Sequence, residues 1–304
     1  MRSAVIGIGS NSVRALLGEK AGGTVRRLWR DREGTRLFAG LDEAGNLSVP
    51  AIRKTAEAVG RMAEKARQLG AEQLDIFATS AARDAANGDL LIAEIQKAAG
   101  VPPEIVSGEE EARLSFAGAS LAAPGTGRCG VIDIGGGSTE IVTGEGEQID
   151  CALSCQMGAV RLYQSIQLES RNDMTIAEKA AQEILQEKLA EAGNFRMPEC
   201  WVGTGGTFTT LAAMVKQIPW TDRTSMHGTR VSLGEIRAIG EELADMDLEA
   251  RKKLPGLQPG RADIVVHGIC ILLAVMDYLG IPEIIVSEWG NLDGYLIRKL
   301  SGND

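Results

Sequence analysis

The sequence predicts an α/β protein of two domains, and three observations support that prediction. Apolar runs of strand length alternate with helical segments along the whole chain, which is the pattern of α/β folds. The length of 304 residues suggests about two domains, because a domain commonly holds about 100–200 residues. The stretch at 4–18 also returns in related form at 130–144, which indicates a duplicated unit.

The first half begins with a strand at 4–8, a turn at Gly9–Ser12 and a second strand at 13–18. We then expect a helix at 51–69, a strand at 74–79, a loop at 80–84, a helix at 89–99 ending near Gly100, a strand at 104–107 and a helix at 109–122. Ser107 and Glu110 form a capping-box pattern at the start of the last helix. Pro124–Gly127 is the best candidate for a linker, which predicts domains at 1–124 and 125–290.

The second half begins with a strand at 130–134 and a turn at Gly135–Ser138. Further predicted elements are helices at 158–168 and 175–192, a strand at 200–203 that enters the small-residue loop 203–207, helices after that loop and at 232–244 and 261–280, a strand at 283–287 and a last helix at 291–300.

The repeat joins residues 4–18 to residues 130–144, a shift of 126 positions. The identical pairs are Val5/Val131, Ile6/Ile132, Ile8/Ile134, Gly9/Gly135, Ser12/Ser138 and Gly18/Gly144. Any two glycine-turn hairpins share some identities, but this register extends over strand, turn and strand. We therefore interpret it as duplication.

Loops of small residues let backbone N–H groups approach a phosphate closely, and small polar side chains add donors. We expect the two loops to bind phosphates. The residues assigned to this role are Ser10, Asn11, Ser12, Gly135, Gly136, Gly137, Ser138 and Thr139.

The two copies differ at charged positions. Asp133 replaces Gly7, and Glu140 replaces Arg14. Two carboxylates suit Mg²⁺ (or Mn²⁺), a hard cation that prefers oxygen ligands, whereas an arginine suits phosphate. The sequence therefore predicts a metal site at Asp133 and Glu140 and an anion contact at Arg14. Asp133 could also be an ordinary turn residue at a strand end.

Charge and composition exclude several function classes. A net charge of −9 and a pI near 5.0 argue against binding to nucleic acid or an acidic membrane. The two histidines, His227 and His267, are too few for a multi-histidine metal centre, and His267 lies in an apolar run that favours packing. The odd number of scattered cysteines and the absence of a signal-like apolar run predict a cytoplasmic protein, with Cys151 and Cys155 as buried small apolar residues.

Several segments together resemble the exopolyphosphatase/guanosine pentaphosphate phosphatase (Ppx/GppA) family. They occur in the family's order over nearly the whole chain: GSNSVR (9–14), TSAARDAAN (79–87), SGEEEARLSFAG (107–118), VIDIGGGSTEIV (131–142), GTGGTFTTLAA (203–213), RAD followed by Gly268, and VSEWGNLDG (286–294).

The resemblance implies duplicated ribonuclease-H-like domains of the actin-like ATPase superfamily around a cleft, with the last helix (291–304) packing back on the first domain. It implies Mg²⁺-dependent hydrolysis of a terminal phosphoanhydride in polyphosphate or pppGpp, and so a link to the stringent response. It places the catalytic glutamate at Glu111 and an anion-binding arginine at Arg83. Gly205, Gly206 and Thr207 of the third loop are assigned to substrate binding.

Glu111 has a second interpretation, because Glu109, Glu110 and Glu111 are also the acids expected in a helix's first turn. From spacing alone the helix-dipole role is favoured; the resemblance favours catalysis.

Two positions depart from the family pattern. The first loop of the family usually begins with Asp, where this chain has Gly7, and the final motif usually carries Arg, where this chain has Leu292. The family's longer members also have a C-terminal helical extension, so a short polyphosphate or a nucleotide is the expected ligand here.

Three functions therefore remain open: a phosphohydrolase, a non-catalytic protein that binds polyphosphate or a guanosine alarmone, and a kinase of the same superfamily. The first is the leading hypothesis. The expected partner of such a phosphohydrolase is a small anionic substrate, and neither nucleic acid nor a membrane is expected. The sequence does not determine the oligomeric state, and a homodimer is the state we consider.

Overall fold

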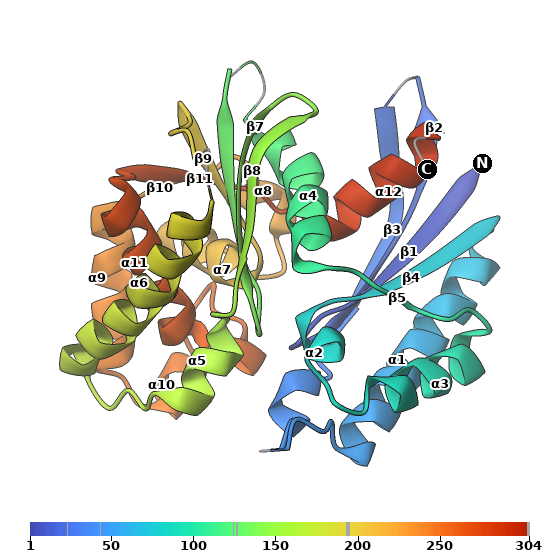
Figure 1. The fold of residues 1–304 in the computed structure, drawn as a ribbon, viewed down its shortest axis with the longest axis horizontal. Helices are drawn as coiled ribbons and strands as arrows, with labels where there is room; N and C mark the ends of the chain where they lie inside the picture. Colours follow the sequence, from blue (N-terminus) through green and yellow to red (C-terminus); the bar gives the residue numbers. More distant parts are fainter. Residues whose placement is uncertain (23, 43, 124, 126, 193–194, 303–304) are drawn as a thin grey trace. The chain divides into compact units, whose positions relative to one another are not determined.

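The computed structural model describes residues 1–304 except 23, 43, 124, 126, 193–194 and 303–304. The chain divides into two compact units: unit 1 is Met1–Leu114 with Asn291–Asp304, and unit 2 is Ser115–Gly290. Each unit holds one mixed sheet with helices packed on it, which confirms the α/β class (Figure 1). The division falls inside helix α4, earlier in the chain than the predicted boundary at 124/125; residues 124 and 126 of the predicted linker are outside the described residues.

Unit 1 is built on a five-stranded sheet of order β3-β2-β1-β4-β5. Its elements are β1 (Arg2–Ile8), β2 (Val13–Ala21), β3 (Thr24–Glu33), η1 (Leu37–Gly40), α1 (Val49–Gln68), β4 (Gln73–Ala78), α2 (Ser80–Arg83), α3 (Gly88–Ala99), β5 (Glu104–Ile105), the first part of α4 (Gly108–Ala119), and α12 (Asn291–Ser301).

The side chains of β1 alternate between two apolar layers, as a strand buried on both faces requires. Ala4 packs with Ala66 of α1, whereas Val5 packs with Leu292 and Leu296 of α12. Gly7 shares the face of Val5 because it lies two residues further along the strand. The α12 face of the sheet therefore carries Gly7 and its cross-strand partner Arg14.

Unit 2 is built on a six-stranded sheet of order β10-β11-β9-β6-β7-β8. Its elements are the rest of α4, η2 (Ser120–Ala122), β6 (Cys129–Ile134), β7 (Thr139–Glu145), β8 (Gln148–Cys155), α5 (Ala159–Ser165), η3 (Arg171–Asp173), α6 (Met174–Glu191), β9 (Cys200–Thr204), α7 (Gly206–Val215), α8 (Arg223–Met226), β10 (Arg230–Ser232), α9 (Leu233–Ala244), α10 (Leu248–Arg251), η4 (Pro259–Arg261), α11 (Val265–Leu279) and β11 (Glu283–Val286).

An extensive apolar core lies in unit 2. Ile132 and Ile134 of β6 pack there with the apolar sides of α6 and α11, which are in contact with one another. Cys151 and Cys155 belong to the same buried cluster, as predicted, and burial raises the pKa of the Cys155 thiol to about 12. His267 is also buried, as its apolar surroundings in the sequence indicate.

The sheet registers confirm the duplication position by position. Gly7 pairs with Arg14 across β1 and β2, and Asp133 pairs with Glu140 across β6 and β7. The register shifts between Leu17 and Gly18 in one unit and between Thr143 and Gly144 in the other, again 126 positions apart. A β-bulge at the equivalent position of both hairpins supports duplication, because bulges are retained within related structures.

Each bulge glycine receives a helix side chain. A Cβ added to Gly18 would lie 2.8 Å from Leu296 of α12, and one added to Gly144 would lie 3.0 Å from Phe116 of α4. Helix α12 therefore occupies in unit 1 the sheet face that α4 occupies in unit 2.

Several local predictions were wrong. The edge strands β3, β8 and β10 were missed; β3 alternates poorly because it carries four arginines, as charged edge strands often do. The loop predicted at 80–84 is the short helix α2, because the N–H groups of Arg83 and Asp84 reach back to the carbonyls of Thr79 and Ser80. The strand predicted at 104–107 has ladder partners only at Glu104 and Ile105.

No helix in the described part of the chain is both long and apolar enough to span a membrane.

Candidate functional site

The first glycine loop is held by the segment that follows β3. Gly9 N–H donates to Ser12 O (3.1 Å), while the carbonyls of Ser10 and Asn11 accept from residues 38 and 36 at 2.9 and 3.1 Å. Since a trans peptide points its C=O and N–H in opposite directions, the amides of Asn11 and Ser12 face away from that segment. The loop therefore presents backbone donors, as a phosphate-binding loop requires.

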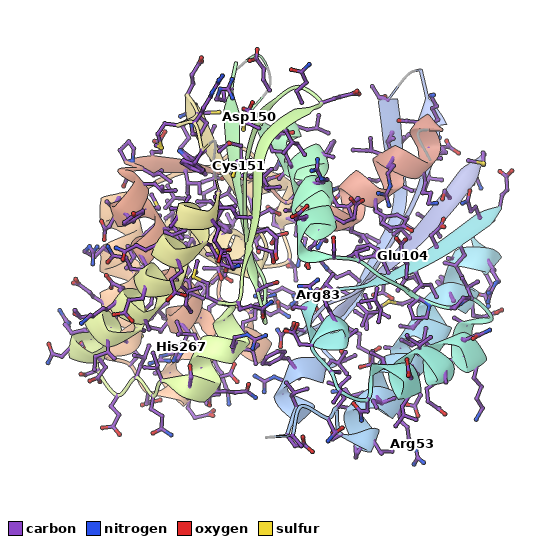
Figure 2. All side chains as sticks on the ribbon, in the orientation of Figure 1. Arg53, Arg83, Glu104, Asp150, Cys151 and His267 are labelled. Carbon is purple, nitrogen blue, oxygen red and sulfur yellow. The ribbon has the colours of Figure 1, made fainter. Side chains whose placement is uncertain are left out.

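Helix α2 brings Arg83 beside this loop. Ser80 Oγ lies 2.9 Å from Ser10 Oγ, and Thr79 N–H donates to Ile8 O, so the start of α2 is fixed to the end of β1. Arg83 is the last residue of α2 and is labelled in Figure 2. Its Nη1 donates to Val106 O at 2.9 Å and lies 3.5 Å from Glu111 Oε2.

Arg83 and Glu111 form a pair in which one guanidinium nitrogen lacks a hydrogen bond. Nη2 of Arg83 is buried and has no hydrogen-bond partner among the described residues. A buried guanidinium donor without a partner is costly, and an anionic oxygen would satisfy it. The guanidinium also compensates the charge of the Glu111 carboxylate, which is only 6% exposed.

The three glutamates at the start of α4 have different surroundings. Glu109 is exposed, Glu110 pairs with Arg298 of α12, and Glu111 is buried against Arg83. Ser107 Oγ accepts from Glu110 N–H at 3.1 Å, as the capping pattern predicts. An interaction with the helix dipole accounts for the exposed Glu109. It does not account for the burial of the Glu111 carboxylate beside Arg83.

Unit 1 carries a row of basic side chains next to the loop. Arg14 stands directly opposite Arg32 across β2 and β3. Arg14 donates to Asn291 Oδ1 at 2.8 Å, and Arg32 Nε donates to Ser12 Oγ at 3.3 Å. Like charges directly opposite destabilise a sheet, so an anion beside them would be stabilising. Arg32 was not predicted, because β3 was not recognised as a strand.

The second glycine loop is held by the start of α5. The carbonyls of Gly135 and Gly136 accept from the N–H groups of Ala159 and Val160 at 3.0 and 2.9 Å, and Gly137 O accepts from Arg161 Nε at 2.8 Å. As in unit 1, the carbonyls are engaged on one side, so the following amides face the other. Thr139 Oγ1 donates to Met157 O at 2.5 Å, which gives this hydroxyl a structural bond.

Unit 2 carries an acidic row where unit 1 carries the basic one. Asp133 and Glu140 are directly opposite, and both are buried. Asp133 Oδ2 accepts from Ser115 Oγ at 2.6 Å, and Glu140 Oε1 accepts from Ser154 Oγ at 2.9 Å. Thr204 is the neighbour of Asp133 on β9. The row is therefore made of carboxylate and hydroxyl oxygens.

The third loop lies against Asp133. Gly205 has a left-handed φ of 99°, and a Cβ there would lie 3.0 Å from Asp133 Oδ1. A Cβ on Gly206 would fall 1.8 Å from Cζ of Arg261, so the guanidinium rests on the N-terminus of α7. Thr207 is buried at the same helix start, close to Gly268.

Arg261 is a functional candidate that sequence reasoning missed. A cation at a helix N-terminus is unfavourable by itself, because that end of the helix dipole is positive. Cation and helix end together favour an anion. The RAD segment had been noted as a motif, and its arginine could have been found there, but only the fold brings it to Gly206.

One known protein family matches nearly the whole chain. The Ppx/GppA phosphatase family matches residues 17–302. The chain belongs to this family. Exopolyphosphatase 2 of Mycobacterium tuberculosis (strain ATCC 25618 / H37Rv) is 34% identical over 96% of this chain and 97% of its own length.

Solved structures of similar proteins cover the same length. A PPX-GPPA enzyme of Aquifex aeolicus is 26% identical, with a TM-score of 0.83 over 98% of this chain and 99% of that one. An exopolyphosphatase from Cytophaga hutchinsonii is 25% identical, with a TM-score of 0.90 over 99% and 98%. These relatives confirm the actin-like ATPase fold class and make this protein a hydrolase of the phosphatase type.

The two departures from the Ppx/GppA pattern touch one another. A Cβ on Gly7 would lie 3.2 Å from Leu292 Cδ1 and 3.0 Å from the Phe77 ring. The position that corresponds to Asp133 is therefore filled by apolar side chains in unit 1. Gly7 in place of the usual Asp and Leu292 in place of the usual Arg therefore take part in the same apolar contact.

The acidic row of unit 2 fits Mg²⁺. Among the described residues no three His, Cys, Asp or Glu side chains gather as a complete metal cage. Mg²⁺ is commonly held by one or two carboxylates plus substrate phosphates and waters, so such a cage is not required. The buried, facing carboxylates of Asp133 and Glu140 are the oxygen donors that would hold the ion.

Proposed function

We propose that the protein hydrolyses the terminal phosphoanhydride bond of a short inorganic polyphosphate or of pppGpp, with Glu111 assisting the attacking water. The observation that carries the proposal is the division of charge between equivalent rows. The basic row contains Arg14 and Arg32, and the acidic row contains Asp133 and Glu140. The name of the Mycobacterium tuberculosis relative supports polyphosphate as substrate class.

Glu111 and Arg83 supply the chemistry of unit 1. The Nη2 of Arg83, which lacks a hydrogen-bond partner among the described residues, binds an oxygen of the terminal phosphate, and the Glu111 carboxylate accepts a proton from the water. The water oxygen forms a bond to the terminal phosphorus while the anhydride P–O bond breaks. The departing chain keeps the electron pair, and orthophosphate is released.

Unit 2 supplies charge compensation. The amides of the second loop and the Arg261–α7 N-terminus bind phosphate oxygens. When bound at Asp133 and Glu140, Mg²⁺ would offset negative charge on the phosphates. The hydroxyls of Ser115 and Ser154 each hold one oxygen of these carboxylates in place.

A phosphate-release assay with wild type, Glu111→Gln and Glu109→Gln tests this function. Tripolyphosphate, longer polyphosphates, pppGpp and ATP are compared at fixed Mg²⁺. Glu111→Gln is expected to lose about 10²–10⁴-fold in rate, the usual contribution of a general base. The matched control Glu109→Gln, whose carboxylate is exposed, is expected to retain the wild-type rate. Equal rates for Glu111→Gln and wild type would refute the assigned role.

A second candidate function rests on the apolar contact of Gly7, Phe77 and Leu292. Without an acid in the first loop, the protein would bind polyphosphate or a guanosine alarmone without turnover. Calorimetry that finds tight binding together with no phosphate release from any substrate would establish this alternative. Turnover of any tested substrate by wild type, lost in Glu111→Gln, would remove it.

A further inference from the structure

The first turn of α12 holds two arginines of unit 1 in different ways. Arg14 on β2 donates from Nη2 to Oδ1 of Asn291 at 2.8 Å. Arg27 on β3 donates from Nε to Oδ1 of Asp293 at 2.7 Å and forms an ion pair with that carboxylate. Asn291 and Asp293 are the first and third residues of α12, so one helix turn gives a neutral partner to Arg14 and a charged partner to Arg27.

The neutral partner orients Arg14 without compensating its charge. A carboxamide oxygen accepts a hydrogen bond from a guanidinium as a carboxylate oxygen does, but the amide carries no net charge. Asn291 is only 3% exposed, so its side chain is packed in place and keeps its oxygen on Arg14. Arg14 is therefore positioned and still carries its full charge.

The strands on either side of Arg14 do not supply a carboxylate either. Its partner on β1 is Gly7, whereas the equivalent pair in unit 2 is Asp133 with Glu140. Its partner on β3 is Arg32, a side chain of the same sign. Among the described residues Arg14 forms no ion pair, and it is only half-buried. An anion can therefore approach an arginine whose charge its neighbours leave uncompensated.

We propose that Asn291 sets the affinity of unit 1 for polyanionic phosphates, because its neutral amide positions Arg14 and leaves the arginine's charge for the ligand. The ligand class is an anion with several phosphate charges, such as tripolyphosphate. Asn291 is a positioning residue, since it contacts Arg14 and Arg14 contacts the phosphate. The inference rests on the proposed function for the identity of the ligand, and binding rather than turnover tests it.

Calorimetry with tripolyphosphate tests the inference on the full chain at fixed Mg²⁺, in a Glu111→Gln background that limits consumption of the ligand. Asn291→Asp changes the amide into a carboxylate of the same shape. It should weaken binding about tenfold or more, because a compensated guanidinium attracts an anion less strongly. Asn291→Leu removes the acceptor without adding charge and should weaken binding less than Asn291→Asp does.

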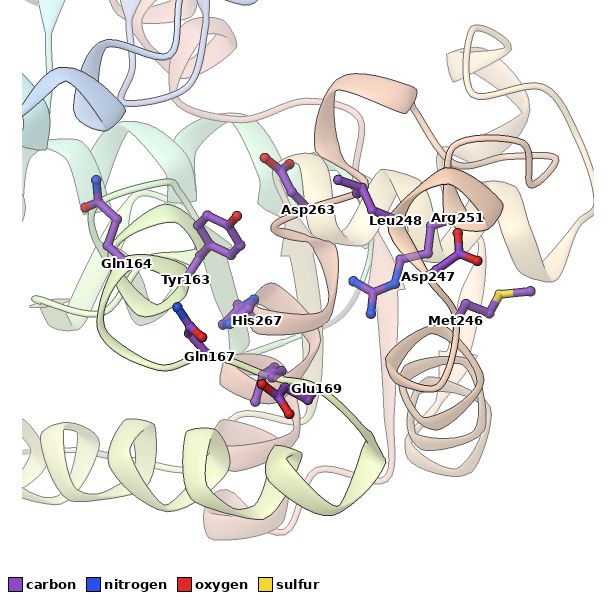
Figure 3. Close-up of a pocket in the computed structure, with 11 residues that line it drawn as sticks. Tyr163, Gln164, Gln167, Glu169, Met246, Asp247, Leu248, Arg251, Asp263 and His267 are labelled. Carbon is purple, nitrogen blue, oxygen red and sulfur yellow. The ribbon is translucent and has the colours of Figure 1, made fainter.

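A matched control makes the same chemical change elsewhere. Gln164 lines a pocket of unit 2 whose lining includes none of the residues assigned to phosphate or metal (Figure 3). Gln164→Glu also converts an amide into a carboxylate and adds one negative charge to the chain. It should bind tripolyphosphate as the parent chain does, because an exposed charge away from the ligand is screened by salt.

The thermal stability of the same variants separates an effect of charge from a loss of packing. Asn291→Asp keeps an acceptor for Arg14, whereas Asn291→Leu leaves that donor without its partner. Asn291→Asp should therefore have a Tm at or above that of Asn291→Leu, although it binds tripolyphosphate more weakly. A merely structural role would give the same order in affinity as in Tm.

Equal affinity of Asn291→Asp and the parent chain would overturn the inference. Equal losses of affinity in Asn291→Asp and Asn291→Leu would also overturn it, because Asn291 would then act only as a support for the Arg14 side chain. So would the absence of tripolyphosphate binding by the parent chain. Phosphate release by the wild type is measured separately; its absence would refute the proposed function and would leave the predicted order of affinities unchanged.

Discussion

Asp133 on β6 stands directly opposite Glu140 on β7, and both carboxyl groups are buried on the sheet face that receives Ser115 of α4. Facing carboxylates repel each other, so the folded state is expected to gain stability when a cation lies between them. At the same register in unit 1, Gly7 stands opposite Arg14. One duplicated frame has thus acquired two complementary electrostatic roles.

Mg²⁺ should stabilise the protein through Asp133. A ligand at about 100 times its Kd adds about 2.7 kcal/mol to the free energy of unfolding, which corresponds to a rise in Tm of several degrees for a chain of this size. We expect this rise for wild type and for Glu147→Gln, whose carboxylate is exposed in the β7–β8 turn. Asp133→Asn should show little or none in differential scanning fluorimetry. An equal rise in Asp133→Asn would mean that the cation binds elsewhere.

Placing an acidic side chain at position 7 should destabilise the protein. The added side chain would meet the Phe77 ring at 3.0 Å and Leu292 at 3.2 Å, so Gly7→Asp should lower the free energy of unfolding by about 1–3 kcal/mol, as overpacking does. The double variant Gly7→Asp/Leu292→Ala provides room beside Arg14 and should recover part of that loss in urea unfolding. Gly34→Asp is the control, since no atom lies within 4 Å of its Cβ position. A Gly7→Asp protein as stable as Gly34→Asp would contradict the close packing.

Gly206→Ala tests the position of Arg261 without removing its charge. The new methyl group would overlap the guanidinium, which must leave the N-terminus of α7. If Arg261 binds substrate phosphate there, KM should rise about tenfold or more, the worth of a charged hydrogen bond. Gly234→Ala, at the start of α9 with open space around its Cβ position, should leave KM unchanged. An unchanged KM for Gly206→Ala would exclude this role.

The stability of the protein should fall in mildly acidic solution, partly through His267. Burial lowers the pKa of this imidazole; the hydrogen bond to Ile166 O opposes that shift, Arg251 adds to it, and Asp263 opposes it weakly. The unfolded chain then binds a proton at higher pH than the folded one, so this contribution is complete above about pH 6.5 and is lost as pH falls below it. His267→Gln should show a shallower fall of Tm between pH 7.5 and pH 5. The same slope in both proteins would contradict a buried neutral ring.

Residue pairs within one strand–turn–strand segment could be predicted from the sequence. Asp133 and Glu140 could be paired from the repeat alone, because cross-strand partners follow from turn length and alternation. Contacts between distant segments could not be predicted in this way. Leu292 meets Gly7, and Arg261 meets Gly206, only through helix packing that no local pattern encodes. The edge strand β3, which carries Arg32, was not predicted because its arginines obscure the alternation of a half-buried strand.

In the proposed reaction, water assisted by Glu111 attacks the terminal phosphorus. Hydrolysis of tripolyphosphate in H₂¹⁸O, followed by mass spectrometry of the products, measures this directly. The released orthophosphate is expected to carry one ¹⁸O and the remaining diphosphate none, and Glu111→Gln is expected to slow this release about 10²-fold or more. Label in the remaining chain, or labelled release at the wild-type rate by Glu111→Gln, would contradict it.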